Sequence, residues 1–173
     1  MSGKLIRILK YPEATLMAPS APVNLDKLDQ FQELIDDMIY TMYYHEGVGL
    51  AAPQVGQRYR IFIIDQRPIN GNQRTDPWVF INPVITPVDD NRVVRPEGCL
   101  SFPGLLAEVG RAEWVTVTAF DREGKEFTLD ASYNHLFSVA LQHEYDHLEG
   151  TLLSDRAKGK DRRAIQAWAA KRA

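Results

Sequence analysis

The sequence predicts an α+β domain, with strands in the middle of the chain and helices on either side of them. Apolar residues recur at three- and four-residue steps near the N-terminus and again after residue 134. Between these stretches lie short runs rich in β-branched and aromatic residues. No repeat or long linker interrupts the chain, so we expect residues 1–173 to form one domain around one core.

The first predicted helix follows an extended segment that contains three prolines. Its apolar stripe consists of Leu25, Leu28, Phe31, Leu34, Ile35, Met38, Ile39 and Met42. Asn24 or Asp26 can cap the start of this helix, and Gly47 stands just past its end. We therefore expect an amphipathic helix near the N-terminus, with one face buried.

The middle of the chain contains four predicted strands. They cover residues 60–65, 78–82, 113–121 and 125–129. A turn at 121–124 joins the last two strands as a hairpin. Prolines divide the rest of this region, namely Pro83, Pro87, Pro96 and Pro103. Because proline cannot donate to a strand ladder, we expect only short edge or irregular strands there.

Two more helices are predicted toward the C-terminus. The first covers residues 134–149 and stops at Gly150. One of its faces carries Leu136, Val139, Ala140, His143 and His147. The second runs from Lys160 to Arg172 and is basic, with Ile165, Trp168 and Ala169 on its apolar side.

The composition excludes several classes of protein. A net charge of −3 gives no global field for nucleic acid or a membrane surface. No apolar run is long enough to span a bilayer, and the N-terminus lacks the apolar stretch of a signal peptide, so we expect a cytoplasmic protein. The single cysteine, Cys99, rules out an intramolecular disulfide. A lone cysteine is more often a small buried hydrophobe than a reactive group.

The motif H-E-x-x-H at residues 143–147 is the first sign of chemistry. His143 and His147 are four residues apart on a predicted helix, so both imidazoles can reach one metal ion. Glu144 points about 100° around the helix and can reach a ligand of the ion without binding the ion. The alternative is a chance match. Two of the four histidines of the chain lie on the apolar face of this helix, and this favours a metal site over a chance match.

A hydrolytic metal site needs three protein ligands and an open position for water. Downstream of His147, Glu149 and Asp155 are too near to serve as the usual third ligand, and no histidine follows. Upstream, Cys99 stands in the segment Glu-Gly-Cys-Leu-Ser at 97–101. A cysteine binds metals as its thiolate, and the neighbouring Gly98 lets the backbone approach closely.

Three blocks together resemble the peptide deformylase family: Gly-Val-Gly-Leu-Ala-Ala-Pro-Gln at 47–54, the 97–101 segment, and Gln-His-Glu-Tyr-Asp-His at 142–147. The resemblance extends from Leu5 to about Asp155. It implies antiparallel β-sheets packed around a central metal-binding helix, and one divalent ion held by Cys99, His143 and His147. Ligand chemistry alone would favour zinc. The resemblance favours Fe²⁺, with Zn²⁺, Ni²⁺ or Co²⁺ as possible substitutes.

The resemblance also implies a reaction, which is hydrolytic removal of the formyl group from the N-terminal methionine of nascent peptides. It assigns the proton transfers to Glu144, and the oxyanion to the metal, the Gln54 side chain and the backbone N–H of Leu100. Peptide binding is implied for Gly47, Val48, Gly49, Gly98, Leu100, Val139 and Ala140. The plainer interpretation of these apolar residues is that they belong to the core.

Three charged residues near the blocks have two interpretations each. Glu97 could orient a ligand histidine or hold a neighbouring loop, and Arg111 could pair with Glu97 or be a solvated arginine at a strand end. Asp146 could support the ligand His147 or be a surface carboxylate of the helix. Several bacterial members of the family carry an arginine shortly after the cysteine block, where this chain has Leu106. We therefore expect an altered preference for residues beyond methionine.

The resemblance implies formylmethionyl peptides as the partners of this enzyme. We expect no association with a membrane, and we expect a monomer. The basic helix at 160–172 could dock on the ribosome, or it could be a solvated helix with Trp168 tucked against the body. Two rival functions remain open. A zinc endopeptidase would have no role for Cys99 and Gln54, and a non-catalytic binding module would not need Glu144.

Overall fold

The computed structural model describes residues 3–65 and 77–172. Its strands are β1 Gly49–Ala51, β2 Ile61–Ile64, β3 Trp78–Pro87, β4 Arg92–Gly98, β5 Leu106–Ala112, β6 Val115–Phe120 and β7 Glu126–Asp130. Its helices are α1 Gln32–Tyr44, α3 His135–Leu148, α4 Leu153–Arg156 and α5 Gly159–Ala170, with short 3-10 helices at Ala14–Met17, Leu25–Phe31 and Ala52–Val55. Antiparallel sheets mixed with helices confirm the predicted α+β class.

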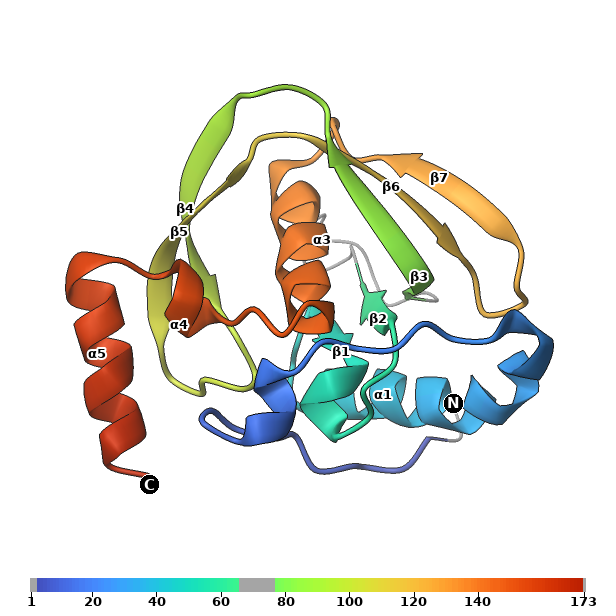
Figure 1. The fold of residues 1–173 in the computed structure, drawn as a ribbon, viewed down its shortest axis with the longest axis horizontal. Helices are drawn as coiled ribbons and strands as arrows, with labels where there is room; N and C mark the ends of the chain where they lie inside the picture. The colour runs from blue at the N-terminus through green and yellow to red at the C-terminus, as the bar shows by residue number, and fades with distance from the viewer. Residues whose placement is uncertain (1–2, 66–76, 173) are drawn as a thin grey trace.

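The strands form two antiparallel sheets with helix α3 between them (Figure 1). The larger sheet has the order β1-β2-β3-β6-β7, and the smaller consists of β4 and β5. Helix α3 contacts strands of both sheets. The predicted central helix is therefore confirmed, and its residues face the groups that both sheets present.

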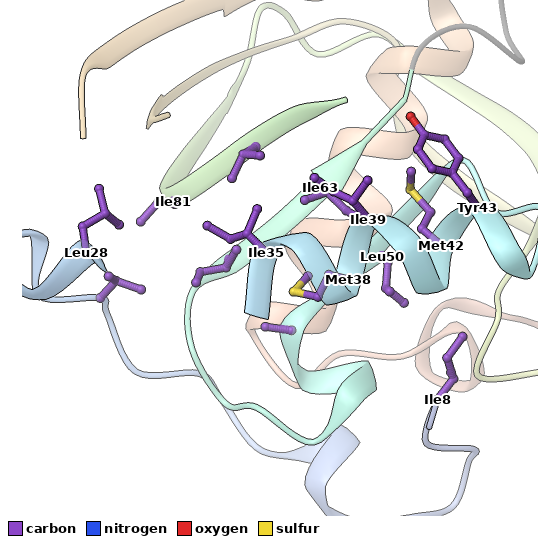
Figure 2. Close-up of a cluster of buried hydrophobic side chains, with 14 residues drawn as sticks. Ile8, Leu28, Ile35, Met38, Ile39, Met42, Tyr43, Leu50, Ile63 and Ile81 are labelled. Atoms are coloured by element: carbon purple, nitrogen blue, oxygen red, sulfur yellow. The ribbon is translucent and has the colours of Figure 1, made fainter. Parts of the chain in front are cut away.

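Strand β2 is buried on both faces, which explains why it is a continuous apolar run. Ile61 and Ile63 join a core with helix α1, while Phe62 and Ile64 join a second core with helix α3. Figure 2 shows the first core, in which the apolar stripe of α1 packs over Leu50 and Ile63. The sheet is thus fixed between the two helices.

The N-terminal helix differs from the prediction at both ends. Leu25–Phe31 is a 3-10 helix, and the α-helix begins only at Gln32. Asn24 does cap this segment, because its side chain accepts from the backbone N–H of Asp26. At the other end, Glu46 and not Gly47 adopts the left-handed conformation, with φ of 55°. Gly47 is instead required by close packing, since a Cβ there would lie 2.9 Å from Leu100 Cδ1.

The strands predicted at 60–65, 113–121 and 125–129 are present as β2, β6 and β7. The strands between the prolines are longer than expected, because β3 continues through Pro83 and β4 contains Pro96. Their edge or irregular character was predicted, and β4 does lie at the edge of a two-stranded sheet. Strand β3 accommodates Pro83 at a register shift between Ile81 and Val84. The β4–β5 pair has no simple apolar alternation, and this is why sequence patterning missed it.

The two C-terminal helices are present at their predicted places. The Asn134 side chain caps α3 by accepting from two backbone N–H groups, and Gly150 follows with φ of 70°. In α5, Ile165 is buried and the Trp168 ring packs against Phe102. Within residues 3–65 and 77–172, no helix combines the length and apolarity needed to cross a membrane.

Candidate active site

Three metal-ligating side chains meet where α3 faces the end of β4. One donor atom each from Cys99, His143 and His147 lies within 4.8 Å of the other two. His147 is buried and its Nε2 is 3.3 Å from the Cys99 Sγ. The two histidines share a face of α3 because they are four residues apart, as predicted. The cysteine reaches them from another part of the chain, just after β4.

A buried ion-pair network contacts the Nδ1 side of the His143 ring. Its Nδ1 lies 2.8 Å from Glu97 Oε2, which leaves Nε2 as the ring nitrogen for a metal. Arg111 donates to both carboxylate oxygens of Glu97, at 2.7 and 2.8 Å, and also pairs with Asp146. Arg156 donates to Asp146 as well. The structure thus brings Glu97, Arg111 and Asp146 together in one buried network. From the residue types alone, a buried network could not be distinguished from charges on a solvated surface.

The charges of this network follow from burial and hydrogen bonding. Burial opposes ionisation of Glu97, but the hydrogen bonds with Arg111 and His143 outweigh it and lower its pKa to about 2. Burial also lowers the pKa of His143, yet its bonds to Cys99 and Glu97 raise the pKa well above the usual value. Burial together with the charge of His143 lowers the pKa of His147. His143 therefore holds a proton more readily than His147 does, and a cation bound by these donors would compete with that proton.

Glu144 lies beside these donors in a tightly packed position. Its side chain is buried, and among the described residues Oε2 has no hydrogen-bond partner. A Cβ at Gly49 would lie 2.5 Å from Glu144 Oε1, so only glycine there allows the carboxylate to sit against strand β1. Burial raises the pKa of Glu144 to about 7. A carboxyl group with a pKa near neutrality suits acid–base chemistry.

Gln54 and Leu100 lie beside the cysteine donor, because Gln54 contacts Cys99 and Leu100 follows Cys99 in the chain. The buried Gln54 accepts from the backbone N–H of Ala51 at 2.9 Å, which orients its amide. Its Nε2 then lies 3.2 Å from Ser101 Oγ and 3.5 Å from Cys99 Sγ. Ser101 belongs to the 97–101 segment, but no role was predicted for it. Its hydroxyl can accept a hydrogen bond, and this property could have marked it as a partner for the Gln54 amide.

Cys99, His143, Glu144, Gln54 and Leu100 line one cleft of about 940 Å³, while His147 is buried behind it. The predicted peptide-binding residues line it: Gly47, Val48, Gly49, Gly98, Leu100, Val139 and Ala140. Leu106 and Leu136 line it too, although they are 69% and 52% exposed. Strand β1 stands at the edge of its sheet, so within residues 3–65 and 77–172 one side of its backbone has no neighbouring strand. Lys10 also reaches this cleft, and sequence reasoning missed it because nothing near residue 10 marks it.

The comparisons with known proteins agree with this geometry. The profile of the polypeptide deformylase family matches residues 5–163. The chain is 43% identical over 150 residues to a peptide deformylase of Chromohalobacter salexigens, covering 87% of this chain and 84% of that protein.

Solved structures are similar over nearly the whole chain. A peptide deformylase of Legionella pneumophila has a TM-score of 0.84 and 39% identity, covering 97% of this chain and 95% of that one. A peptide deformylase of Ehrlichia chaffeensis in complex with actinonin has a TM-score of 0.84 and 32% identity, with the same coverage. The match to the family profile and the high identity of these relatives lead to one assignment. This chain belongs to the polypeptide deformylase family.

Proposed function

We propose that this protein is a metal-dependent hydrolase that removes the formyl group from the N-terminal methionine of nascent polypeptides and releases formate. The observation that carries the proposal is the meeting of the donor atoms of Cys99, His143 and His147 within 4.8 Å of one another, next to a cleft that Cys99, His143 and Glu144 line. Membership of the deformylase family supports the choice of substrate. An endopeptidase site would not need the cysteine among its donors.

The donor set fits a divalent transition metal. One thiolate and two imidazoles are typical ligands for zinc and for iron, and three protein ligands leave a position open. We propose Fe²⁺ as the native ion, with Zn²⁺, Ni²⁺ or Co²⁺ as substitutes. An ion held there supplies Lewis acidity, which makes water a stronger acid and polarises a carbonyl.

Glu144 is proposed to move the proton. Its carboxylate takes a proton from the attacking water, the hydroxide adds to the formyl carbon, and a tetrahedral species forms. The carbon–nitrogen bond then breaks, and Glu144 returns the proton to the methionine nitrogen, which leaves as an amine. The other product is formic acid, which transfers its proton to the released amine and becomes formate. A buried carboxyl with a pKa of about 7 is suited to both transfers.

Gln54 and Leu100 are proposed to stabilise the negative oxygen of the tetrahedral species. The Gln54 Nε2 is held by the bond from Ala51 N–H to its Oε1, and it faces the same cleft as the metal donors. Leu100 directly follows the ligand Cys99, so its backbone N–H is placed by the same turn. Loss of one such donor typically lowers the rate by about 10²–10³.

The cleft also suits a peptide with methionine at its end. The outer edge of β1, which no other described strand covers, can pair with an extended peptide backbone, with Gly47 and Val48 before it. Such pairing depends little on sequence, as an enzyme acting on many nascent chains requires. Val139 and Ala140 of α3 line the same cleft and offer an apolar surface for the methionine side chain.

The first experiment measures formate release from formyl-Met-Ala-Ser by protein purified without oxygen. We expect release by the wild type and a loss of about 10²–10⁴ in rate for Glu144→Ala. Glu126→Ala, which changes an exposed glutamate of β7, is the matched control and should keep full activity. Absence of formate from protein shown to contain its metal would favour a binding module. Cleavage of internal peptide bonds would favour an endopeptidase.

The identity of the ion is tested by loading the protein with iron or nickel. We expect the iron form to lose activity in air, because ferrous iron and the Cys99 thiolate both oxidise. The nickel form should keep more of its activity under the same conditions. Full activity of the iron form after prolonged aeration would contradict Fe²⁺ as the native ion.

We further propose that the protein acts in the cytoplasm as a single chain and docks on the ribosome through α5. A thiolate ligand needs a reducing compartment. The exposed basic residues of this region are Lys158, Lys160, Arg162, Arg163, Lys171 and Arg172. Reversing Arg162 and Arg163 to glutamate should abolish co-sedimentation with ribosomes while Ile165 keeps the helix in place. Unchanged co-sedimentation would leave α5 as a solvated helix.

A further inference from the structure

The segment Leu9–Tyr11 joins the two parts of the chain that carry the proposed oxyanion donors. The backbone N–H of Leu9 donates to the Gln54 carbonyl at 2.7 Å, and that of Tyr11 donates to the Ser101 carbonyl at 3.1 Å. Between them, the Lys10 Nζ donates to the Leu100 carbonyl at 2.6 Å, across 90 residues of sequence. Three successive residues therefore connect the Gln54 segment to the turn after Cys99.

The hydrogen bond that closes the turn after Cys99 does not fix the orientation of its central peptide group, Leu100–Ser101. The Phe102 N–H donates to the Cys99 carbonyl at 2.9 Å, which makes Cys99–Phe102 a β-turn with Leu100 and Ser101 at its centre. The hydrogen bond that closes a β-turn does not involve the central peptide group, and turn types differ mainly in how that group is rotated. The Lys10 ammonium bonds the carbonyl of this central peptide and so selects one orientation.

The orientation of this peptide affects the proposed Gln54 donor through Ser101, which follows it directly. Ser101 places its Oγ 3.2 Å from the Gln54 Nε2. A rotated central peptide would change φ of Ser101 and so displace the hydroxyl that holds the Gln54 amide, whereas the Leu100 N–H belongs to the preceding peptide.

Placing the Lys10 ammonium group in the wall of the cleft costs hydration, and a specific hydrogen bond is needed to offset this cost. Lys10 is half-buried in the wall of the cleft, and burial lowers the pKa of its ammonium group. The nearby charges of Cys99 and Glu13 favour the charged form. A hydrogen bond from a charged donor to a carbonyl is stronger than a neutral one, and this offsets the loss of hydration.

We propose that Lys10 is a positioning residue, which holds the Leu100–Ser101 peptide so that the Ser101 hydroxyl keeps the Gln54 amide directed at the oxyanion. The proposal rests on the function proposed above. It assigns to Lys10 no contact with the substrate and no proton transfer.

The kinetic test compares Lys10→Met, which keeps the length but not the donor, with Lys10→Arg, which keeps a charged donor. We expect Lys10→Met to lower kcat about tenfold, with KM and metal content per chain unchanged, because slight misplacement of catalytic groups reduces the rate. Lys10→Arg should recover most of the loss. Lys4→Met is the control, since it removes an exposed lysine that pairs with Glu33.

A second measurement keeps the proposal separate from the reaction. In zinc-loaded protein labelled with nitrogen-15, the signals of the Leu100 and Ser101 amides and the Gln54 side chain should shift in Lys10→Met but not in Lys4→Met. Unchanged signals, a kcat within about twofold of wild type, or equal impairment of the arginine variant would each overturn the positioning role. If the wild type releases no formate, the proposed function fails, and the signals still decide whether Lys10 holds the turn.

Discussion

Helix α3 and the turn Cys99–Phe102 supply the two sides of the candidate metal site, and they hold their side chains in different ways. In α3, the spacing of His143 and His147 follows from the helix itself, whose backbone bonds are all local. The turn instead depends on distant partners. Gln54 reaches Cys99 across 45 residues, and Lys10 reaches Leu100 across 90.

This difference indicates how each side should respond to substitution. Changing a side chain on α3 removes one group and leaves the helix intact, because the backbone does not rely on it. Changing a partner of the turn leaves every catalytic group present but moves it. The helix side should therefore show losses of chemistry, and the turn side should show graded losses of geometry.

The largest effect is expected when a metal ligand is removed, either from the turn or from the helix. Cys99→Ala and His147→Ala should each lose the bound ion and lower formate release by more than about 100-fold. Loss of a mere supporting partner of a ligand already lowers metal affinity about 10–100-fold. The measurement is metal per chain together with kcat/KM. Full metal content in Cys99→Ala would show that the turn does not supply a ligand.

A smaller effect is expected when the helix side is disturbed through its packing. In Gly49→Ala the new methyl group would meet the Glu144 carboxylate, and the carboxylate must move. We expect kcat to fall by up to about 100-fold with the metal retained, since a shift of about 1 Å can have that effect. Gly110→Ala is the matched control, because a Cβ there meets nothing within 4 Å.

Retention of wild-type kcat by Gly49→Ala would mean that the Glu144 carboxylate can act from another position. A parallel loss of activity in Gly110→Ala would point to a general sensitivity of the strands and would remove the support for a specific contact. Either result would weaken the view that the helix side is fixed by local geometry.

The same contrast explains what sequence alone could predict of the fold. Helix α3 and the β6–β7 hairpin were predicted because apolar periodicity, caps and turn residues are local signals. The β4–β5 pair was missed because its exposed and buried residues do not alternate regularly in β4, and Pro96 argued against a strand. Its place is fixed by packing against α4 and α5, which no local pattern records.

The site divides along the same line. His143, Glu144 and His147 could be proposed from spacing on one helix. Cys99 became a candidate because no third ligand follows His147, and the resemblance of short blocks assigned it, whereas Gln54 entered through the resemblance alone. Glu97 and Arg111 could not be decided, because burial determines whether charged residues form a network or a solvated face. Lys10 had no signal at all, since its role depends on a contact 90 residues away.

Glu97 joins the two sides, because it lies on β4 and contacts His143 on α3 at 2.8 Å. Glu97→Gln keeps the shape but removes the charge that Arg111 and His143 both face. We expect metal affinity to fall by about 10–100-fold, measured by competition with a chelator. Thermal stability should also fall, since Arg111 would lose one of its two buried acidic partners. Unchanged affinity would mean that β4 does not orient the helix ligand.

The smallest expected effect concerns the mouth of the cleft, where β5 presents Leu106 to solvent. Leu106→Arg should raise kcat/KM for formyl-Met peptides with an acidic residue farther along, relative to peptides with an apolar one. The change should not exceed about fivefold, because an exposed ion pair contributes at most about 1 kcal/mol. Val94→Arg, on the exposed surface of β4, is the control and should leave the preference unchanged. An equal shift in Val94→Arg would attribute the effect to net charge, whereas a shift confined to Leu106→Arg would place the peptide beyond methionine over β5.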